Sequence, residues 1–303
     1  MRIIENTTEF HLENKSAVAL GKFDGIHLGH RRLLEQVLEQ KSQGLWTVVF
    51  TFDTSAASFF GGETKELSTR EEKRAVFSRL GIDVLIEFPL NRGTAATEPA
   101  EFVARYLAEQ MRTAYLCAGP DISFGKGGAG DYKLLSEYAG TCGYQVELID
   151  KVRVDGEEVS STRVRQAVRE GDMEKVSVML GAPYCVSGKV VHGRQLGRKL
   201  GMPTANILPD VRKLLPPNGV YYSRARLGDA VYRGISNVGC KPTVSDEKIM
   251  GVETYLYDFS GEVYDRDMTV ELLAFRRAER TFESVEALRR QIEADVEAGR
   301  SFS

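Results

Sequence analysis

Short apolar runs alternate with helical patterns over the first half of the chain. The runs typical of buried strands span residues 16–23, 46–52, 83–88, 114–119 and 144–149. After the first run, Leu33, Leu34, Val37 and Leu38 fall at i, i+1, i+4 and i+5, which indicates one face of a helix. Further helices are predicted over 69–80, 99–110 and 132–139. Strands that alternate with helices predict an α/β domain with a parallel, doubly wound sheet, whose ligands bind at the carboxyl ends of the strands.

The pattern changes after the Gly-Ala-Pro break at 181–183. Strand-like runs separated by turns follow at 186–191, 219–227, 230–238, 251–258 and 268–274. Successive strands without helices between them predict an antiparallel β-barrel. The last predicted element is a helix over 284–298, expected to pack on the barrel through Val285, Leu288, Ile292 and Val296. We therefore predict two domains, 1–182 and 183–303.

Length and composition agree with two globular domains. The chain has 303 residues, of which 42% are hydrophobic and 27% charged. Its net charge of −3 argues against a general nucleic-acid binder. The four cysteines are widely spaced and form no CxxC pair, which favours a reducing compartment. Because the chain has neither an apolar signal segment nor an 18-residue apolar run, we expect a cytoplasmic protein that does not span a membrane, and self-association is left open.

The stretch 187–206, SGKVVHGRQLGRKLGMPTAN, carries the densest candidate chemistry. Glycines recur in it every four residues, with cations between them: Gly193, Arg194, Gly197 and Gly201. Such a pattern is typical of a loop that wraps phosphate with its backbone N–H groups. Thr204 and Asn206 offer neutral oxygen atoms suited to a magnesium ion that keeps most of its waters. The stretch lacks the Walker pattern, and a solvated basic hairpin loop is the alternative.

The glycine-rich turn that leads to Pro-Thr-Ala-Asn resembles the flavokinase signature, and further flavokinase landmarks match in order at 218–221, 237–243 and 252–254. The resemblance implies a flavokinase-like barrel that phosphorylates riboflavin with MgATP. It implies that Glu253 is the general base for the primary hydroxyl that attacks the γ-phosphate. Without the resemblance, a Glu in an apolar strand is more often a paired or rim residue. The other implied contacts are Thr204 and Asn206 to magnesium, and Asn237 and Arg277 to flavin.

A turn rich in glycine and histidine follows the first buried strand. Its candidate phosphate-binding residues are Gly21, Phe23, Asp24, Gly25 and Gly29. His27 and His30 are three apart at the start of a helix, so both can face one ligand. A helix N-terminus attracts anions, and the imidazoles can donate hydrogen bonds to phosphate as charge builds in a transition state. The alternatives are a zinc pair, whose further ligands are not nearby in the sequence, and surface histidines on an ordinary turn.

A second candidate phosphate site opens a later helix and consists of Ser160, Ser161, Thr162 and Arg165. Hydroxyls and an arginine at a helix N-terminus suit a triphosphate, although Ser or Thr there is also a common N-cap. These residues resemble the I-S-S-T-x-x-R motif of the nucleotidylyltransferase superfamily, with Arg165 as the motif arginine. The turn at 21–30 resembles the H-x-G-H motif of the same superfamily and, over G-x-F-D-G-x-H-x-G-H, its flavin adenylyltransferase branch.

Residues 119–131 resemble a third segment of that branch, D-x-x-F-G-x-x-x-x-G-D, with Asp121 and Phe124 at its first conserved letters. The resemblance implies a nucleotidylyltransferase-like Rossmann fold that transfers AMP from ATP to FMN, giving FAD and pyrophosphate. The implied roles are charge stabilisation by His27 and His30, phosphate binding by Ser161, Thr162 and Arg165, and flavin contact by Asp121 and Phe124. The same stretch also fits the dinucleotide pattern G-x-G-x-x-G at 125–130. Residues 120–124 separate that pattern from its strand, so a nicotinamide-dependent oxidoreductase is the weaker hypothesis.

The resemblance covers the whole chain in the bifunctional prokaryotic arrangement, adenylyltransferase first and kinase second. It implies riboflavin, FMN and ATP as substrates and Mg²⁺ as cofactor. Two departures stand out. The family usually has T-F-D-P-H-P where this chain has T-F-D-T-S-A-A at 51–57, and Tyr-Gly where this chain has Tyr264-Asp265. The lost His-Pro pair supports a second hypothesis, a riboflavin kinase whose first domain is a degenerate nucleotide- or flavin-binding module, and FAD formation from FMN separates the two.

Overall fold

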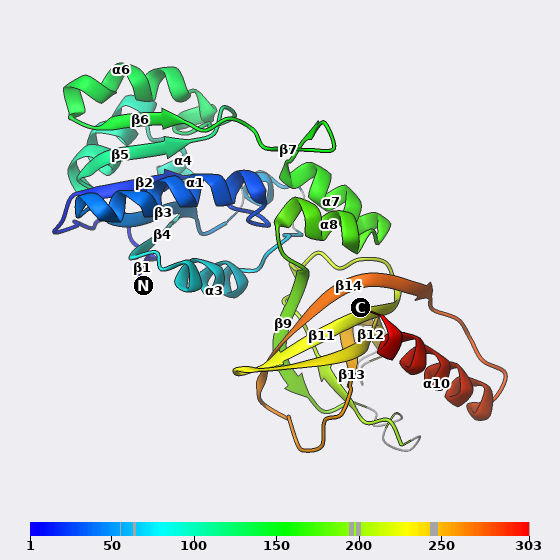
Figure 1. Cartoon of the computed structure of the whole chain (residues 1–303). Helices are drawn as coiled ribbons and strands as arrows, with labels where there is room; N and C mark the ends of the chain where they lie inside the picture. Colours follow the sequence, from blue (N-terminus) through cyan, green and yellow to red (C-terminus); the bar gives the residue numbers. More distant parts are fainter. Residues whose placement is uncertain (55, 63–64, 194–196, 198–200, 243–247, 303) are drawn as a thin grey trace. The chain divides into compact units, whose positions relative to one another are not determined.

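The chain divides into two compact units, Met1–Ser161 and Thr162–Ser303 (Figure 1). The computed structural model describes residues 1–302 except 55, 63–64, 194–196, 198–200 and 243–247. Each unit has its own sheet and its own apolar core. The domain limits inferred from the sequence, 1–182 and 183–303, stay a prediction.

The first unit is built on a sheet in which every neighbouring pair of strands is parallel. Along the sheet the strands are β1 (Arg2–Glu5), β4 (Val84–Phe88), β3 (Trp46–Phe52), β2 (Ser16–Leu20), β5 (Thr113–Ala118) and β6 (Gln145–Leu148). The parallel, doubly wound sheet predicted from the sequence is confirmed. The sequence does not predict β1, because this short edge strand is mostly exposed and lacks an apolar run.

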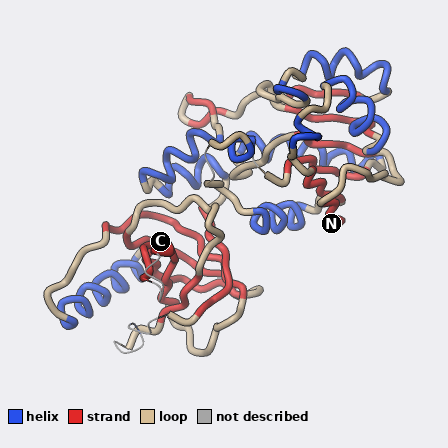
Figure 2. Tube along the Cα trace, turned by 180° about the vertical axis from the view of Figure 1, so that it is seen from behind, coloured by secondary structure: helices blue, strands red, loops and turns tan. Residues whose placement is uncertain are grey.

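Helices cover both faces of this sheet, as Figures 1 and 2 show. One face packs against α1 (Leu28–Glu39) and α3 (Arg70–Leu80), and the other against η2 (Phe102–Gln110) and α6 (Tyr132–Cys142). Strands β2 and β4 are buried at every residue, as expected of parallel strands between two helical layers. The remaining elements of this unit are short: η1 (Gln40–Gln43), α2 (Ala56–Phe59), α4 (Arg92–Ala95), α5 (Pro99–Glu101), η3 (Lys126–Gly128), β7 (Arg153–Val154) and β8 (Glu157–Glu158).

The strand order reverses between β2 and β5. From β2 the chain builds β3 and β4 on one side, and it later adds β5 and β6 on the other. Ligands of doubly wound sheets bind at such a switch point, beyond the carboxyl ends of the strands. Strand β2 ends at Leu20 rather than at the predicted residue 23, because Phe23 takes a positive φ of 50° that no strand accommodates. The turn that carries the histidines therefore begins at the switch point itself.

The second unit contains a closed antiparallel barrel, also as predicted. Around the barrel the strands are β10 (Thr204–Ile207), β13 (Lys248–Leu256), β12 (Ala230–Pro242), β11 (Gly219–Leu227), β14 (Asp267–Ala278) and β9 (Tyr184–Val191). A chain of hydroxyl hydrogen bonds crosses the interior, from Ser223 to Ser236 and from Ser236 to Thr254, each at 2.8 Å. The sequence does not predict β10, because Pro-Thr-Ala-Asn has no apolar alternation.

The barrel closes through its shortest pairing. Strands β9 and β10 pair only at Val190 with Ile207 and Val191 with Asn206. By contrast, β11 and β12 pair along the whole of Gly219–Leu227. The short seam lies at the two ends of the glycine-rich stretch that connects β9 to β10.

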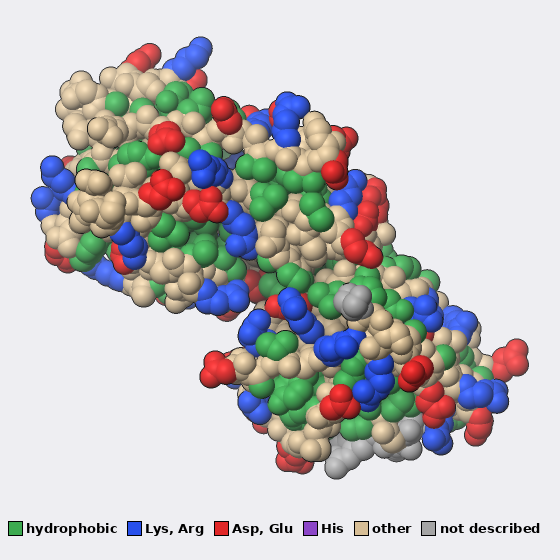
Figure 3. Space-filling view, viewed as in Figure 1, with side chains coloured by type: hydrophobic (Ala, Val, Ile, Leu, Met, Phe, Trp, Pro, Cys, Tyr) green, Lys and Arg blue, Asp and Glu red, His purple; other side chains and the backbone are tan. Residues whose placement is uncertain are grey.

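Two helices precede the barrel strands, α7 (Ser161–Glu170) and α8 (Met173–Leu180). The start of α7 agrees with the sequence, whereas α8 was not anticipated. Helix α8 packs against β9 and β14 and buries Met173, Val176, Met179 and Leu180. In the part of the chain that the structure describes, no helix has both the length and the apolar character to span a bilayer. Acidic and basic side chains are interspersed over the face shown in Figure 3.

The chain ends in helix α10 (Val285–Ser301), which Ser284 caps by accepting a hydrogen bond from Ala287 N at 3.1 Å. The helix is confirmed, but its predicted contact face is wrong at Val285, which is 55% exposed. The residue that anchors the helix is polar. Buried Asp295 accepts hydrogen bonds through Oδ2 from Arg277 Nη2 at 2.6 Å and Nε at 2.9 Å, and through Oδ1 from Gln291 Nε2 at 2.9 Å.

We expect Asp295→Asn to lower the free energy of unfolding of the barrel unit by about 3 kcal/mol, because it leaves a guanidinium without its buried counter-charge. The control is Glu293→Gln on the same helix, whose exposed pair with Arg289 should contribute less than about 0.5 kcal/mol. Urea unfolding followed by circular dichroism measures both variants. Equal losses in the two would show that Asp295 is not the anchor.

Candidate active sites

The turn after β2 has a strained backbone held by packing. Phe23, Gly25 and Ile26 take φ values of 50°, 86° and 43°. Positive φ is unfavourable for Phe and Ile, and such strain gathers at functional sites. Phe23 is fully buried, with its ring centroid 5.6 Å from that of Phe77 and 5.1 Å from that of His30. The core thus fixes the conformation of the turn.

Asp24 ties this turn to two distant segments. Its Oδ1 accepts hydrogen bonds from Leu67 N at 2.8 Å and Ser68 N at 3.3 Å. Its backbone oxygen accepts a hydrogen bond from Ser161 Oγ at 2.8 Å. The structure therefore brings Ser161 to the predicted turn. It also gives Asp24 a positioning role that the sequence does not reveal.

His27 and His30 lie at the N-terminus of α1 with their rings stacked, the centroids 3.8 Å apart. His27 occupies the N-cap position without a side-chain capping bond, whereas Thr69 caps α3 and Asp131 caps α6. The Nδ1 atoms of both histidines are buried and have no hydrogen-bond partner among the described residues. Orphaned ring nitrogens beside open helix amides form a site for an anion such as phosphate.

Gly21 and Gly29 leave room for the aromatic rings of this site. A Cβ on Gly29 would lie 3.2 Å from the His27 ring, and one on Gly21 would lie 3.2 Å from the Phe23 ring. A zinc site is not supported, because the described part of the chain holds no group of three or more His, Cys, Asp or Glu residues able to bind a metal. Surface histidines are also excluded as an explanation, since His27 is only 8% exposed.

Burial lowers the pKa of His27 to about 4. Burial, and then the neighbouring charges of His27 and Lys73, hold the pKa of His30 well below its usual value. Both rings are therefore neutral at pH 7, and each can donate a hydrogen bond without carrying a charge of its own. This state suits stabilisation of negative charge that develops during a reaction.

The same pKa shifts predict acid sensitivity of the first unit. The pKa of His27 is lower in the folded chain than its unfolded value of about 6.5, so the unfolded chain binds more protons as the pH falls. The free energy of unfolding is therefore highest above pH 6.5 and decreases as the pH falls toward 4. We expect a loss of about 2 kcal/mol between pH 7 and pH 5 from His27. The single tryptophan, Trp46 in β3, reports unfolding of this unit by fluorescence. The double variant His27→Gln/His30→Gln should lose less stability over that interval, and an equal loss would contradict the prediction.

The Ser-Ser-Thr-Arg segment lies at the start of α7. Ser160 precedes the helix and Ser161 begins it. Thr162 is exposed in the first turn, and Arg165 is partly exposed one turn later. The Ser161 hydroxyl contacts the histidine turn by donating a hydrogen bond to the backbone oxygen of Asp24. The phosphate roles of Ser160, Thr162 and Arg165 stay predictions.

Asp121 and Phe124 lie beyond the carboxyl end of β5. The Asp121 side chain is 78% exposed and its carboxylate lies 2.8 Å from Lys151 Nζ. Phe124 is buried, its ring centroid 5.2 Å from that of Phe102. Phe124 therefore shapes the loop from within the core, and contact of either residue with a flavin stays a prediction.

Residues 125–130 do not form a dinucleotide-binding turn. Phe124 and Gly130 pair with each other as a small bridge, with backbone hydrogen bonds of 3.0 and 2.9 Å. Helix α6 follows, but the carboxylate of Asp131 caps its first turn by accepting from Leu134 N at 3.0 Å. A carboxylate in that place repels a pyrophosphate, so the geometry does not favour a nicotinamide site here.

The glycines of the second unit serve the loop between β9 and β10 in different ways. A Cβ on Gly193 would lie 2.7 Å from Asn206 Nδ2, and one on Gly197 would overlap Met202 O. Gly201 instead needs its positive φ of 79°. Arg194 lies outside the described residues, as do 195–196 and 198–200. Gly193 thus brings the backbone close to Asn206, as a loop that wraps a small ligand requires.

A row of polar side chains crosses adjacent barrel strands. In the register, Asn206 of β10 lies opposite Glu253 of β13, and Glu253 lies opposite Asn237 of β12. Thr204, two residues before Asn206 and so on the same face, donates a hydrogen bond to Glu253 Oε1. A hydroxyl, an amide and a carboxylate therefore share one face, and these hard oxygen donors fit a magnesium ion.

A cavity of about 290 Å³ opens beside this row. Gly193, Thr204 and Asn206 line one side of it, and the connection between β13 and β14, including Phe259 and Tyr264, lines the other. The ring of Tyr264 stacks on that of His192 with centroids 3.8 Å apart. The sequence does not single out this connection as part of the site. Only the Tyr-Asp pair in place of Tyr-Gly draws attention to it.

That replacement preserves the turn. Asp265 takes a φ of 60°, the left-handed conformation that glycine adopts most easily and that Asp tolerates better than most residues. Its backbone N–H donates to Val190 O at 2.9 Å, which fixes the connection against β9. The departure from the family pattern therefore leaves the wall of the cavity in place.

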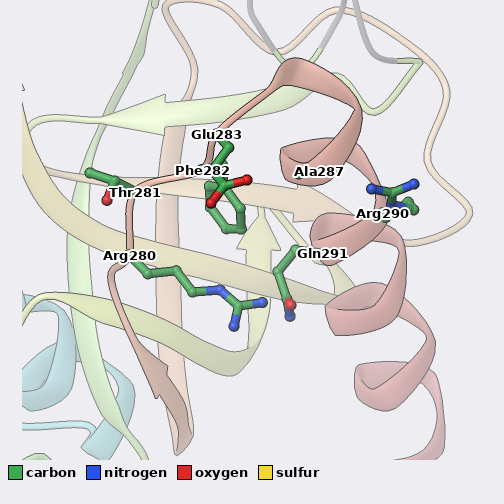
Figure 4. Close-up of a pocket in the computed structure, with 7 residues that line it drawn as sticks. All are labelled: Arg280, Thr281, Phe282, Glu283, Ala287, Arg290 and Gln291. Atoms are coloured by element: carbon green, nitrogen blue, oxygen red, sulfur yellow. The ribbon is translucent and has the colours of Figure 1, made fainter.

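A second cavity, of about 400 Å³, lies between the β14–α10 connection and helix α10. Figure 4 shows Arg280 and Gln291 pointing toward each other across it, with the Phe282 ring nearby. The guanidinium carbon of Arg280 lies 5.1 Å from the Phe282 ring centroid. Arg277, the predicted flavin contact, uses Nε and Nη2 on Asp295, so its role toward flavin stays a prediction.

Comparisons with known proteins match the two parts of the chain to two different family models. A family model described as FAD synthetase matches residues 9–163, and one described as riboflavin kinase matches residues 180–303. A bifunctional riboflavin kinase/FMN adenylyltransferase of Listeria monocytogenes is 33% identical over 98% of this chain and 95% of its own length. The protein of the same description from Bacillus subtilis is 35% identical over 100% of this chain and 99% of its own.

A solved structure extends the likeness to the fold. A Streptococcus pneumoniae protein described as a macrolide-efflux protein superposes with a TM-score of 0.87 and 29% identity over 99% of both chains. The efflux description is that of the Streptococcus protein and is not carried over to this chain.

Proposed function

The chain belongs to the bifunctional riboflavin kinase/FMN adenylyltransferase family, and from this premise we propose which of its residues carry each reaction. The protein phosphorylates riboflavin to FMN and transfers AMP from ATP to FMN, giving FAD and pyrophosphate. ATP is the co-substrate of both steps. One observation supports assigning each step to its own unit: each unit holds a separate polar constellation, the stacked histidines in one and the Asn206–Glu253–Asn237 row in the other.

In the barrel, we assign the triphosphate to the cavity beside Gly193 and the flavin to the cavity between the β14–α10 connection and α10. Glu253 lies between them in the polar row, which reaches the first cavity at Asn206. At the other end, Asn237 donates to Glu279, the neighbour of cavity residue Arg280. A carboxylate in that position can take the proton of the riboflavin primary hydroxyl as the hydroxyl oxygen attacks the γ-phosphate.

Thr204 and Asn206 would hold a magnesium ion, which when bound neutralises charge on the phosphates. The Thr204 hydroxyl also donates to Glu253 and so orients the carboxylate that accepts the proton. Phe259 and Tyr264, which line the cavity beside Gly193, would shield the transferring phosphoryl group from water and so limit hydrolysis.

In the first unit, the neutral imidazoles of His27 and His30 and the open amides of α1 would bind the α-phosphate of ATP. As FMN attacks that phosphate, negative charge grows on its oxygens, and donors already in place stabilise it. The motif resemblance alone assigns Ser161, Thr162 and Arg165 to the outgoing pyrophosphate. The four cysteines are free thiols, which supports a reducing, cytoplasmic location for both reactions.

The test is incubation with riboflavin, ATP and Mg²⁺, with FMN and FAD resolved by chromatography. Both products are expected. FMN without FAD at high enzyme concentration would favour the kinase-only alternative, for which the changed loop at 51–57 is the specific reason. No FMN at all would contradict the assignment of the barrel.

A further inference from the structure

Glu279, just after β14, holds two asparagine side chains. Its Oε1 accepts a hydrogen bond from Asn237 Nδ2 at 3.1 Å, and its Oε2 accepts one from Asn218 Nδ2 at 3.2 Å. The carboxylate lies where a side chain on Gly239 would project, because a Cβ built on Gly239 would overlap Glu279 Oε1. The carboxylate therefore depends on a glycine as well as on two amides for its place.

An ionised carboxylate can only accept hydrogen bonds, so it determines which way each amide faces. The NH₂ group of Asn237 must point toward Glu279, and its oxygen is left for a donor elsewhere. Asn237 lies directly opposite Glu253 in the barrel register. The register thus places this oriented amide on the same face of the sheet as the carboxylate that we assign as the base.

We propose that Glu279 is a positioning residue for riboflavin phosphorylation, which orients Asn237 so that its Oδ1 accepts a hydrogen bond from a hydroxyl of the flavin substrate next to Glu253. The proposal rests on the proposed function. Glu279 acts through Asn237 and takes no proton itself, since both its oxygens are engaged by amides. A hydroxyl held by an acceptor on one side and facing the base on the other is aligned for attack.

Because Glu279 is exposed, its replacement should affect catalysis without affecting the stability of the fold. The residue is exposed, and its bonds to the asparagines are solvent-accessible, so their contribution to stability is small. Glutamine at 279 can donate as well as accept, so it no longer selects one orientation of the Asn237 amide. Catalysis is then affected while the fold is not.

The experiment compares Glu279→Gln with Gly239→Ala, which leaves the carboxylate charged but displaces it. In both variants kcat/KM for riboflavin phosphorylation should fall by up to about tenfold, the effect of losing one hydrogen bond between neutral groups. Melting temperature and FAD formation from supplied FMN should not change. The matched control is Glu286→Gln, an exposed carboxylate in the first turn of α10, which should behave as wild type.

A double-mutant cycle makes the test specific. Adding Glu279→Gln to Asn237→Ala should cause no further loss, because the amide that it orients is gone. Additive losses in the double variant would overturn the proposal, as would full activity of Glu279→Gln. A clear fall in the melting temperature of Glu279→Gln alongside its loss of activity would also overturn it. If the unmutated protein makes no FMN from riboflavin, the proposed function fails instead, and this outcome is distinguishable because the wild type is measured first.

Discussion

Glu253→Gln is expected to lower kcat for riboflavin phosphorylation by about 10²–10⁴-fold, the usual effect of losing a general base. Glutamine keeps the shape of the side chain and can still accept the Thr204 hydroxyl, so the barrel should fold unchanged. It cannot take the proton of the attacking hydroxyl. FMN adenylylation should persist in the same variant, because the histidines lie in the other unit. Single-turnover formation of FMN and FAD, each from its own substrate, measures both steps.

Asp229→Asn, in the turn between β11 and β12, is the control for loss of a carboxylate on the barrel and should retain both activities. Loss of both reactions in Glu253→Gln would show that the units are not independent catalysts. Retention of kinase activity would mean that Glu253 serves only to pair with Thr204.

The second large effect is expected for His27→Ala and His30→Ala, each of which should reduce FMN adenylylation by about 10²–10³-fold, by analogy with loss of one preorganised donor to a developing oxyanion. The loss should appear mainly in kcat, since the interaction is strongest in the transition state. ATP binding should weaken far less, and riboflavin phosphorylation should be unaffected. His11→Ala removes an exposed histidine of the same unit and is the matched control.

The changed loop after β3 provides the sharpest challenge to this prediction. Part of it, Ser55, lies outside the described residues, and the short helix α2 follows. Full FAD synthesis by the His27 variant would refute the role of the turn despite its matching motif. A wild type that makes FMN but no FAD would show that loss of the His-Pro pair has already inactivated the first site.

Periodicity in the sequence was enough to predict both sheets and the closing helix, because buried strands and amphipathic helices depend on local patterns. It was not enough for β1, β10 and α8. Strand β1 is mostly exposed at the edge of the sheet, and β10 begins in the loop-like Pro-Thr-Ala-Asn. The anchor of α10 is a buried aspartate, and no hydrophobic pattern reveals an ion pair with an arginine on a distant strand.

A motif was enough to nominate candidate residues for the two sites, such as His27, Thr204 and Glu253, and their roles stay predictions. The partners of these residues were not predictable, because they come from segments far apart in the sequence. Asp24 is an example. Its carboxylate accepts hydrogen bonds from the backbone of Leu67 and Ser68, which are 43 and 44 residues away in the sequence. Glu279 is another, since its place depends on the absence of a side chain at Gly239. Motif letters identify chemical groups, whereas tertiary contacts determine how those groups are oriented.

The barrel is closed by a short pairing of β9 with β10, next to the cavity to which we assign the triphosphate. Two residue pairs join these strands, and one of them includes Asn206. Protection from hydrogen exchange should therefore be lowest there and highest along β11 and β12, where pairing is continuous. A nucleotide held by Gly193 on one side and Asn206 on the other would join both edges, so part of its binding free energy would serve to keep the barrel shut.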